Sequence, residues 1–275
     1  MSDWGKGVIN NIGWGQGANN DIGWGSIYDK SNAGETLLSG GGFSPLSLFS
    51  NGEQGAWYDP SDLSTLFQDA AGTTPVTASG DPVGLFLDKS GNNNHAKQSI
   101  SVKRPTYMTD GTLHWLNFDG VDDVLVLTRA LEPYFNSFIG NSSRLLGGID
   151  DVFLSDGISS TPGVHIGYND GDEFRIFTSN NIFVAPLNNI IADNERHVLT
   201  IVINDTSSAS INGNLLGTTT KIWNNLNLRY IGGFIEGGNQ SLEGNIYGLI
   251  AVSGGVYTEE ELKKVESYVA NKTGI

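Results

Sequence analysis

The chain is 275 residues long and carries 30 acidic and 15 basic side chains, which give it a formal net charge of −15 at pH 7. This balance excludes the basic surface along which most nucleic-acid-binding proteins follow phosphate groups, and it disfavours adhesion to an anionic membrane. The chain has no cysteine, which excludes disulfides and zinc–thiolate sites, and its 37 Gly and 27 Asn residues favour many short strands joined by tight turns.

The first thirty residues contain a repeat with a period of ten, in which Trp4, Trp14 and Trp24 are each followed by glycine. Such a short unit cannot bury its own tryptophan, and three exposed indole rings favour aggregation unless a partner covers them. We therefore predict that residues 1–49 form an assembly arm whose tryptophans anchor the chain in neighbouring subunits, with a flexible joint at Ser39–Gly42. The alternative is an arm that folds back over its own domain.

The remaining residues, 50–275, alternate short apolar segments with turn clusters, which is typical of two packed antiparallel sheets. The predicted elements are a polar turn at 117–123 leading into a strand at 124–127, strands at 163–168 and 173–178 around a turn at 169–172, a central strand at 197–203, and strands at 228–231 and 244–253. The pair Asn212-Gly213 has apolar flanks and predicts a type I′ hairpin, because both central residues of that turn need positive φ.

One helix is predicted at the end of the chain. Thr258 and Glu261 have the spacing of a capping box, and Gly274 is placed to end the helix. The predicted apolar stripe consists of Leu262, Val265, Tyr268 and Val269. We expect this helix to pack on the sandwich and to carry no chemistry.

Several segments of the body share their pattern and order with a known superfamily. They are the opening segment at 57–69, the segment DKSGNNNHA within 87–96, the segment FDGVDD within 116–123, and the segments at 195–198, 211–217, 230–233 and the final helix. Together they resemble the concanavalin A-like lectin/glucanase superfamily, in particular its laminin-G-like branch, over roughly residues 56–275. The resemblance implies an all-β, two-sheet antiparallel jelly-roll sandwich with an extended N-terminal arm and one C-terminal helix. Since that fold hosts lectins, hydrolases and adhesion modules, it leaves the function open.

The segments at 57–69 and 87–96 also resemble those of bacterial and bacteriophage surface or virion proteins, and the Trp-Gly repeat resembles the N-terminal ends of structural proteins from tailed bacteriophages. This implies a non-enzymatic virion protein, namely a capsid decoration, head fibre or short tail fibre on the particle surface. Its partners would be other virion proteins and further copies of itself, such as a trimer. No signal peptide is recognised at the N-terminus, so synthesis in the host cytoplasm is expected. The alternative is a carbohydrate-binding receptor-recognition module, and a glycoside hydrolase is a distant third.

The sequence predicts no catalytic residues. A hydrolase of this superfamily would carry a string such as Glu-x-Asp-x-Glu, which the chain lacks, and the acidic cluster at 170–173 has the pattern of a solvated hairpin turn. No Gly-x-Ser-x-Gly nucleophile elbow occurs either. We expect His95 and His197 to form hydrogen bonds that fix loops.

Two kinds of binding site stay open at this stage. Asp119, Asp122 and Asp123 offer the hard oxygen ligands that Ca²⁺ prefers, although side chains that cap their own turn are the alternative. No other cofactor is expected. Aromatic residues beside asparagines, as at 223–225 and 168–170, suit glycan binding, but such clusters are frequent enough here that no single glycan site can be named.

Overall fold

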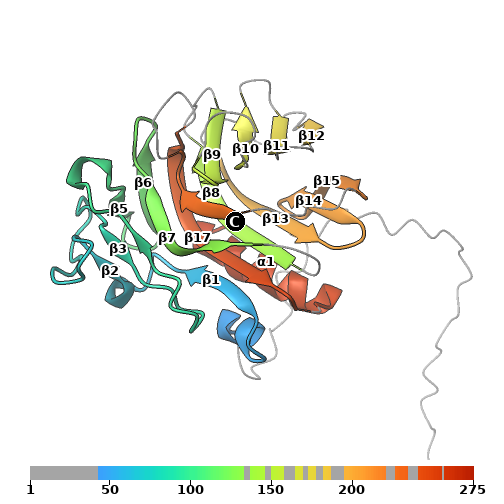
Figure 1. Cartoon of the computed structure of the whole chain (residues 1–275), viewed down its shortest axis with the longest axis horizontal. Coiled ribbons are helices and arrows are strands. Elements are labelled where there is room, and N and C mark those ends of the chain that lie inside the picture. Colours follow the sequence, from blue (N-terminus) through green and yellow to red (C-terminus); the bar gives the residue numbers. More distant parts are fainter. Residues whose placement is uncertain are drawn as a thin grey trace, which may run out of the picture.

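The computed structural model describes residues 43–132, 137–145, 150–157, 165–169, 173–177, 182–186, 195–220, 227–234, 241–255 and 257–275. These residues form two antiparallel sheets and one α-helix, α1 (Glu259–Thr273), which follows the last strand (Figure 1). The predicted all-β sandwich with a C-terminal helix is confirmed. None of the described helices is long and apolar enough to cross a membrane.

The two sheets are called sheet A and sheet B. Sheet A has the spatial order β15 (Asn214–Thr219), β14 (Ser207–Ile211), β13 (Arg196–Ile203), β8 (Ser137–Leu145), β17 (Glu243–Ser253), β6 (His114–Asp119) and β5 (Thr106–Thr109), and β1 (Gln54–Tyr58) also pairs with β17. Sheet B has the order β12 (Ile182–Pro186), β11 (Glu173–Phe177), β10 (His165–Asn169), β9 (Asp150–Ser155), β16 (Leu228–Ile231), β7 (Leu125–Leu131), β4 (Ala96–Lys97), β3 (Leu85–Phe86) and β2 (Leu66–Phe67). Three 3₁₀ turns complete the described elements: η1 (Pro45–Phe49), η2 (Leu63–Thr65) and η3 (Ser101–Lys103).

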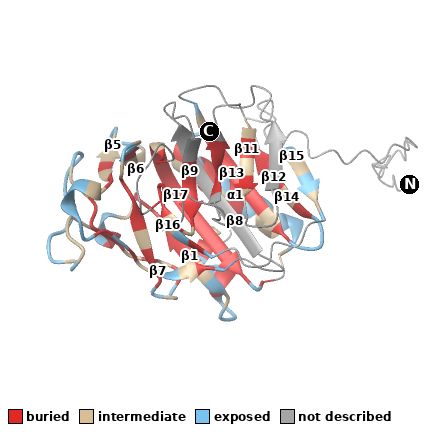
Figure 2. Cartoon of the chain, turned by 45° about the horizontal axis from the view of Figure 1, so that its top comes forward, coloured by how far each residue is buried: buried red, intermediate tan, exposed pale blue. Residues whose placement is uncertain are grey.

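The main core draws buried residues, red in Figure 2, from both sheets. In β11, for example, Phe174 and Ile176 are buried while their neighbours are half-buried, as the alternation of side chains along a strand requires. A second apolar cluster lies beneath α1, where Val265 and Val269 pack with Ile250 of β17. The helix contacts β8, β13 and β17 and therefore covers sheet A.

Local signals in the sequence predicted the hairpin and the helix correctly. Asn212 and Gly213 join β14 to β15 with φ of 49° and 74°, the positive values that a type I′ turn needs. Thr258 and Glu261 form the reciprocal capping box, and Gly274 ends α1 in the left-handed conformation with φ of 69°.

The predicted polar turn at 117–123 is wrong in its first half. Strand β6 continues to Asp119, and its polar residue Asn117 donates a side-chain hydrogen bond of 2.9 Å to Asn245 of β17. The register pairs these same two residues across the sheet. A cross-strand partner therefore accounts for a polar residue that, from its neighbours alone, was expected to lie in a turn.

The predicted arm, residues 1–49, lies mostly outside the described residues, and so do its three tryptophans and the joint at Ser39–Gly42. Only its last residues are described. Phe43 meets Tyr268 of α1 edge to face with ring centroids 6.3 Å apart, and Leu48 and Phe49 of η1 are buried in the cluster beneath the helix. The chain thus enters the sandwich beside α1, and the division into an arm and a body stays a prediction.

Candidate functional site

A cavity of about 500 Å³ lies where strand ends of both sheets meet. Sheet A contributes Gln54, the first residue of β1, and Ser253, the last of β17. On sheet B, Glu132 directly follows β7, Asp156 directly follows β9 and Asn227 directly precedes β16. The volume lies within the range typical of small-molecule sites, and its polar groups come from strand ends and loops held on a rigid scaffold.

An irregularity in the pairing of β7 with β16 helps to form this hollow. Val126 pairs with Tyr230 and Leu131 pairs with Leu228, so residues 127–130 of β7 lie opposite Arg229 alone. Extra residues on one strand break the ladder locally and bend that strand away from its partner. The bend gives Thr128 and Arg129 positions on the wall of the cavity.

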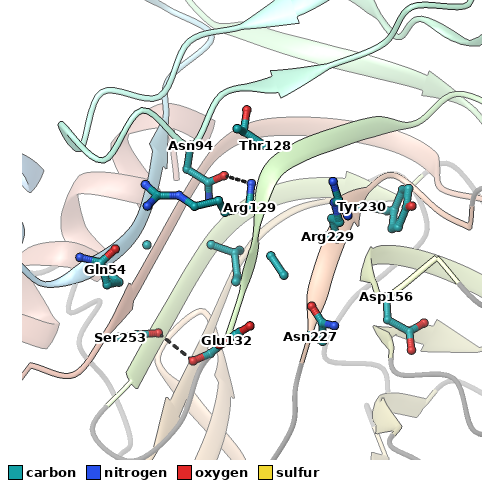
Figure 3. Close-up of a pocket in the computed structure, with 13 residues that line it drawn as sticks. Gln54, Asn94, Thr128, Arg129, Glu132, Asp156, Asn227, Arg229, Tyr230 and Ser253 are labelled. Atoms are coloured by element: carbon teal, nitrogen blue, oxygen red, sulfur yellow. Dashed lines mark hydrogen bonds between the residues drawn. The ribbon is translucent and has the colours of Figure 1, made fainter.

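The wall opposite β16 includes Asn94, whose position is set by a buried carboxylate. Asp88 accepts hydrogen bonds from the backbone N–H groups of Trp57, Ser90 and Asn94, at 2.8–2.9 Å. Asn94 in turn accepts a 2.7 Å bond from the backbone N–H of Arg129 (Figure 3). The segment at 87–96 that resembles the lectin superfamily therefore contributes Asn94 to the wall of the cavity.

Two arginines line the cavity, and each is held through a backbone carbonyl. The Nε–H of Arg229 donates to the carbonyl of Leu127 at 3.3 Å, and a terminal N–H of Arg129 donates to the carbonyl of Asn92. Both side chains are exposed. A guanidinium has five N–H donors, so each arginine retains others that can face a ligand.

Tyr230 supplies the aromatic part of the cavity. Its ring lies against Gly157, where a Cβ atom would come within 2.3 Å of the ring carbon Cε2, and Gly157 also has a positive φ of 88°. Glycine is thus needed there both for backbone conformation and for space. Together the cavity offers an aromatic face, amide groups, two carboxylates and two guanidinium groups, which can form hydrogen bonds to a polyol.

The three carboxylates predicted from the sequence do lie together. One ligand oxygen from each of Asp119, Asp122 and Asp123 lies within 4.8 Å of the others. Asp119 accepts hydrogen bonds from the N–H groups of Val121 and Asp122, at 2.8 and 3.3 Å, and Asp123 accepts from the N–H of Asp119 at 3.1 Å. The turn-capping alternative is therefore observed, whereas calcium binding stays a prediction.

Burial and the neighbouring charge of Asp119 raise the pKa of Asp123 to about 7. Asp119 is exposed and Asp122 is half-buried, and their negative charges disfavour ionisation of the buried Asp123. Lys103 Nζ lies 3.7 Å from a carboxylate oxygen of Asp122. The cluster is thus a place where a proton or a cation would relieve repulsion.

His95 fixes a loop as predicted, whereas the same prediction is wrong for His197, which lies within a strand. The Nδ1 atom of His95 accepts from the backbone N–H of Asp88 at 3.1 Å, inside the loop that carries Asn94. His197 lies within β13 and is fully buried, with Nε2 3.0 Å from the hydroxyl of Tyr168 on β10. That bond joins the two sheets. Tyr168 is itself buried, so it cannot serve as the exposed aromatic platform that the sequence suggested at 168–170.

Other predicted site positions are described only in part. Residues 170–172 and 223–225 lie outside the described residues, as do Trp4, Trp14 and Trp24. Glu173 is described and forms an ion pair of 2.9 Å with Arg175, its neighbour two residues along β11. Neither Arg129 nor Arg229 was predicted as a site residue, and Tyr230 was noted only within the segment at 230–233 that carries the resemblance.

Comparison with known proteins gives likeness of fold. No family model matches the chain, and no curated protein matches it. Among solved structures, an arabinofuranosidase complexed with arabinofuranosyl-α-1,2-xylobiose is similar over 84% of this chain and 65% of its own, with 11% identity and a TM-score of 0.56. Domain 4 of AbnA, a GH43 extracellular arabinanase from Geobacillus stearothermophilus in complex with arabinotriose, is similar over 78% of this chain and 98% of its own, with 13% identity and a TM-score of 0.52.

A sialidase from Trypanosoma rangeli in complex with 2,3-difluorosialic acid is similar over 81% of this chain, with 11% identity and a TM-score of 0.50. The match covers 33% of that sialidase, so the chain spans about a third of its length. These structural neighbours are carbohydrate-binding or glycoside-hydrolase-related proteins. At such low identity they bear on the fold alone, and they agree with the lectin-like sandwich that the sequence resembles.

Proposed function

We propose that the β-sandwich is a carbohydrate-binding module and that the cavity between the strand ends is its site. The observation that carries this proposal is the composition of one cavity, in which Tyr230 lies with amide, carboxylate and guanidinium groups drawn from five strand ends and a loop. Saccharides combine apolar ring faces with many hydroxyl groups, so such a set of side chains suits them. The likeness to domain 4 of an arabinanase, a domain in complex with arabinotriose, supports the same function.

The test is a glycan array probed with the full chain. We expect binding to at least one saccharide class, and we expect Tyr230→Ala to remove it by deleting the aromatic face of the cavity. Trp115→Ala is the matched control, since Trp115 is a half-buried aromatic residue that packs on Tyr247 of sheet A and does not line the cavity. Absence of binding to every saccharide, or equal loss in both variants, would contradict the proposal.

The module is proposed to bind without hydrolysing. A glycosidase needs two carboxyl groups about 5–10 Å apart that act on one bond. Glu132 and Asp156 both line the cavity, so they are the pair to test. We expect no release of reducing ends from bound saccharides by the wild-type chain. Release that Glu132→Gln or Asp156→Asn abolishes would show instead that the cavity is an active site.

The setting proposed for this module is the surface of a tailed-phage particle, as a capsid decoration, head fibre or short tail fibre. This rests on the resemblance of the Trp-Gly repeat and of the segments at 57–69 and 87–96 to phage and surface proteins. The arm would anchor the sandwich to other virion proteins and to further copies of the chain, in an oligomer such as a trimer. Labelling the chain on imaged particles tests this setting independently of glycan binding.

A further inference from the structure

We propose that the cavity selects saccharides that carry a carboxylate, that Arg229 binds the acidic group, and that Arg129 strengthens the attraction. This inference rests on the proposed glycan binding and names the class of sugar. It starts from the arrangement of charge in the cavity, which is lined by the guanidinium groups of Arg129 and Arg229 and by two carboxylates.

The ion pairs that lysine and arginine form with carboxylates among the described residues all lie outside the cavity. Five of the described cations are paired in this way: Lys89, Lys103, Arg175, Lys264 and Lys272. Within the described part of the chain, neither Arg129 nor Arg229 forms such an ion pair. These two guanidinium groups thus form no ion pair among the described residues, although Glu132 and Asp156 line the same cavity.

Arg229 has the geometry of an anchored anion receptor. Its Nε–H is occupied by the carbonyl of Leu127 on the neighbouring strand, at 3.3 Å. The two terminal nitrogens, with four N–H groups, are the part that remains for a ligand. Their planar arrangement matches the two oxygens of a carboxylate, and anchoring reduces the rotamer entropy that binding would otherwise remove.

Arg129 is fixed on the opposite wall. Its side chain donates to the carbonyl of Asn92, and its backbone N–H donates to Asn94. In Figure 3 its guanidinium group extends from β7 toward Gln54, while Arg229 lies on the side of Tyr230. The two cations thus lie on different sides of the cavity. Arg129 therefore adds an attractive field and does not bind the same carboxylate oxygens as Arg229.

The two carboxylates of the cavity decide which anions fit. In Figure 3, Glu132 and Asp156 lie below Arg129 and Arg229. Carboxylate oxygens accept hydrogen bonds from sugar hydroxyls but repel additional negative charge. A sugar with one carboxylate can place it at the arginines and its hydroxyls at the acidic side. A densely sulfated or phosphorylated polymer would bring negative charge to both sides.

The experiment compares acidic saccharides with their methyl esters, in which the ring is unchanged and the charge is removed. An array of uronic- and sialic-acid saccharides, each with its ester, is probed with the full chain and with Arg229→Gln and Arg129→Gln. Arg104→Gln is the matched control, because Arg104 is likewise anchored on two backbone carbonyls and does not line the cavity. We expect the acids to bind more tightly than the esters, and we expect Arg229→Gln to weaken acid binding by about 10- to 100-fold with no effect on esters.

The outcomes separate this inference from the proposed function. If acids and esters bind equally, or if neutral saccharides alone bind, the selectivity is wrong while glycan binding stands. If no saccharide binds, both fail. Loss of binding with Arg104→Gln equal to that with Arg229→Gln overturns the assigned role of Arg229, and a preference for sulfated polymers overturns the role given to Glu132 and Asp156.

Discussion

Acidic pH should lower the free energy of unfolding of the sandwich, because the imidazole of His197 is buried between the sheets. Burial lowers the pKa of His197 to about 4, from an ordinary value of 6.5. The folded chain therefore binds the proton less readily than the unfolded chain. The resulting stabilisation is fully present above pH 6.5 and is lost as the pH falls through about 4.

The size of this effect follows from the difference between the two pKa values. One pKa unit corresponds to about 1.4 kcal/mol, so the fall from 6.5 to about 4 corresponds to about 3 kcal/mol. His197 has no exposed surface, so solvent screening reduces the value little. Because a domain of this kind has about 5–15 kcal/mol of stability in all, the loss should be measurable by urea unfolding.

The assay is the free energy of unfolding between pH 7 and pH 4 for the wild type, His197→Gln and Tyr168→Phe. Subtracting the His197→Gln profile from the wild-type profile removes the contributions of the shared carboxylates and should leave a decline of about 3 kcal/mol. Tyr168→Phe removes the hydroxyl that lies 3.0 Å from Nε2 of His197 but keeps the imidazole buried. The free energy of unfolding of this variant should therefore still decline as the pH falls. If His197→Gln loses stability with acid as steeply as the wild type, the reasoning is refuted.

Three further predictions concern the acidic turn, the helix and the arm. Asp123→Asn should raise the free energy of unfolding relative to the wild type by an amount that grows from pH 4 to pH 8, measured with a chelator present. The pKa of the wild-type carboxyl is raised to about 7, so its stabilising protonation is lost as the pH rises. An unchanged difference across that range would contradict this. Thr258→Ala should lower the free energy of unfolding by about 1 kcal/mol, while Thr258→Ser, which keeps the capping hydroxyl, should not. Replacing Trp4, Trp14 and Trp24 by Ala should leave the thermal unfolding of the sandwich unchanged and abolish incorporation into particles; normal assembly of the triple variant would show that the arm does not anchor it.

The parts of the fold that could be predicted from the sequence are those fixed by neighbouring residues. Asn212-Gly213 needs only its own backbone conformation to specify the hairpin, and the capping box needs only Thr258 and Glu261, three residues apart. The polar residue Asn117 was misplaced because its partner, Asn245, lies 128 positions away. A signal that depends on such a distant residue cannot be read from a window of neighbours.

The cavity was missed for the same physical reason. Its walls come from Gln54, Asn94, Arg129, Asp156 and Arg229, which the sequence separates widely and the two sheets bring together. Asn94 lies in the segment at 87–96 that carries the resemblance, but the other four form no motif with their neighbours. The three aspartates, by contrast, were found because they share one turn, and their proximity needed no tertiary structure.

The charged residues that would distinguish one ligand from another lie outside the segments that carry the resemblance. Within the segment at 87–96, Asp88 holds the loop in place and sets Asn94, so this part of the pattern specifies a wall of the cavity. Arg129 lies within β7, Asp156 directly after β9 and Arg229 within β16, all between such segments, and their exposed or half-buried side chains line the cavity. A resemblance that is specific for the scaffold therefore does not identify the ligand. The saccharide has to be identified by binding measurements on variants of the charged residues.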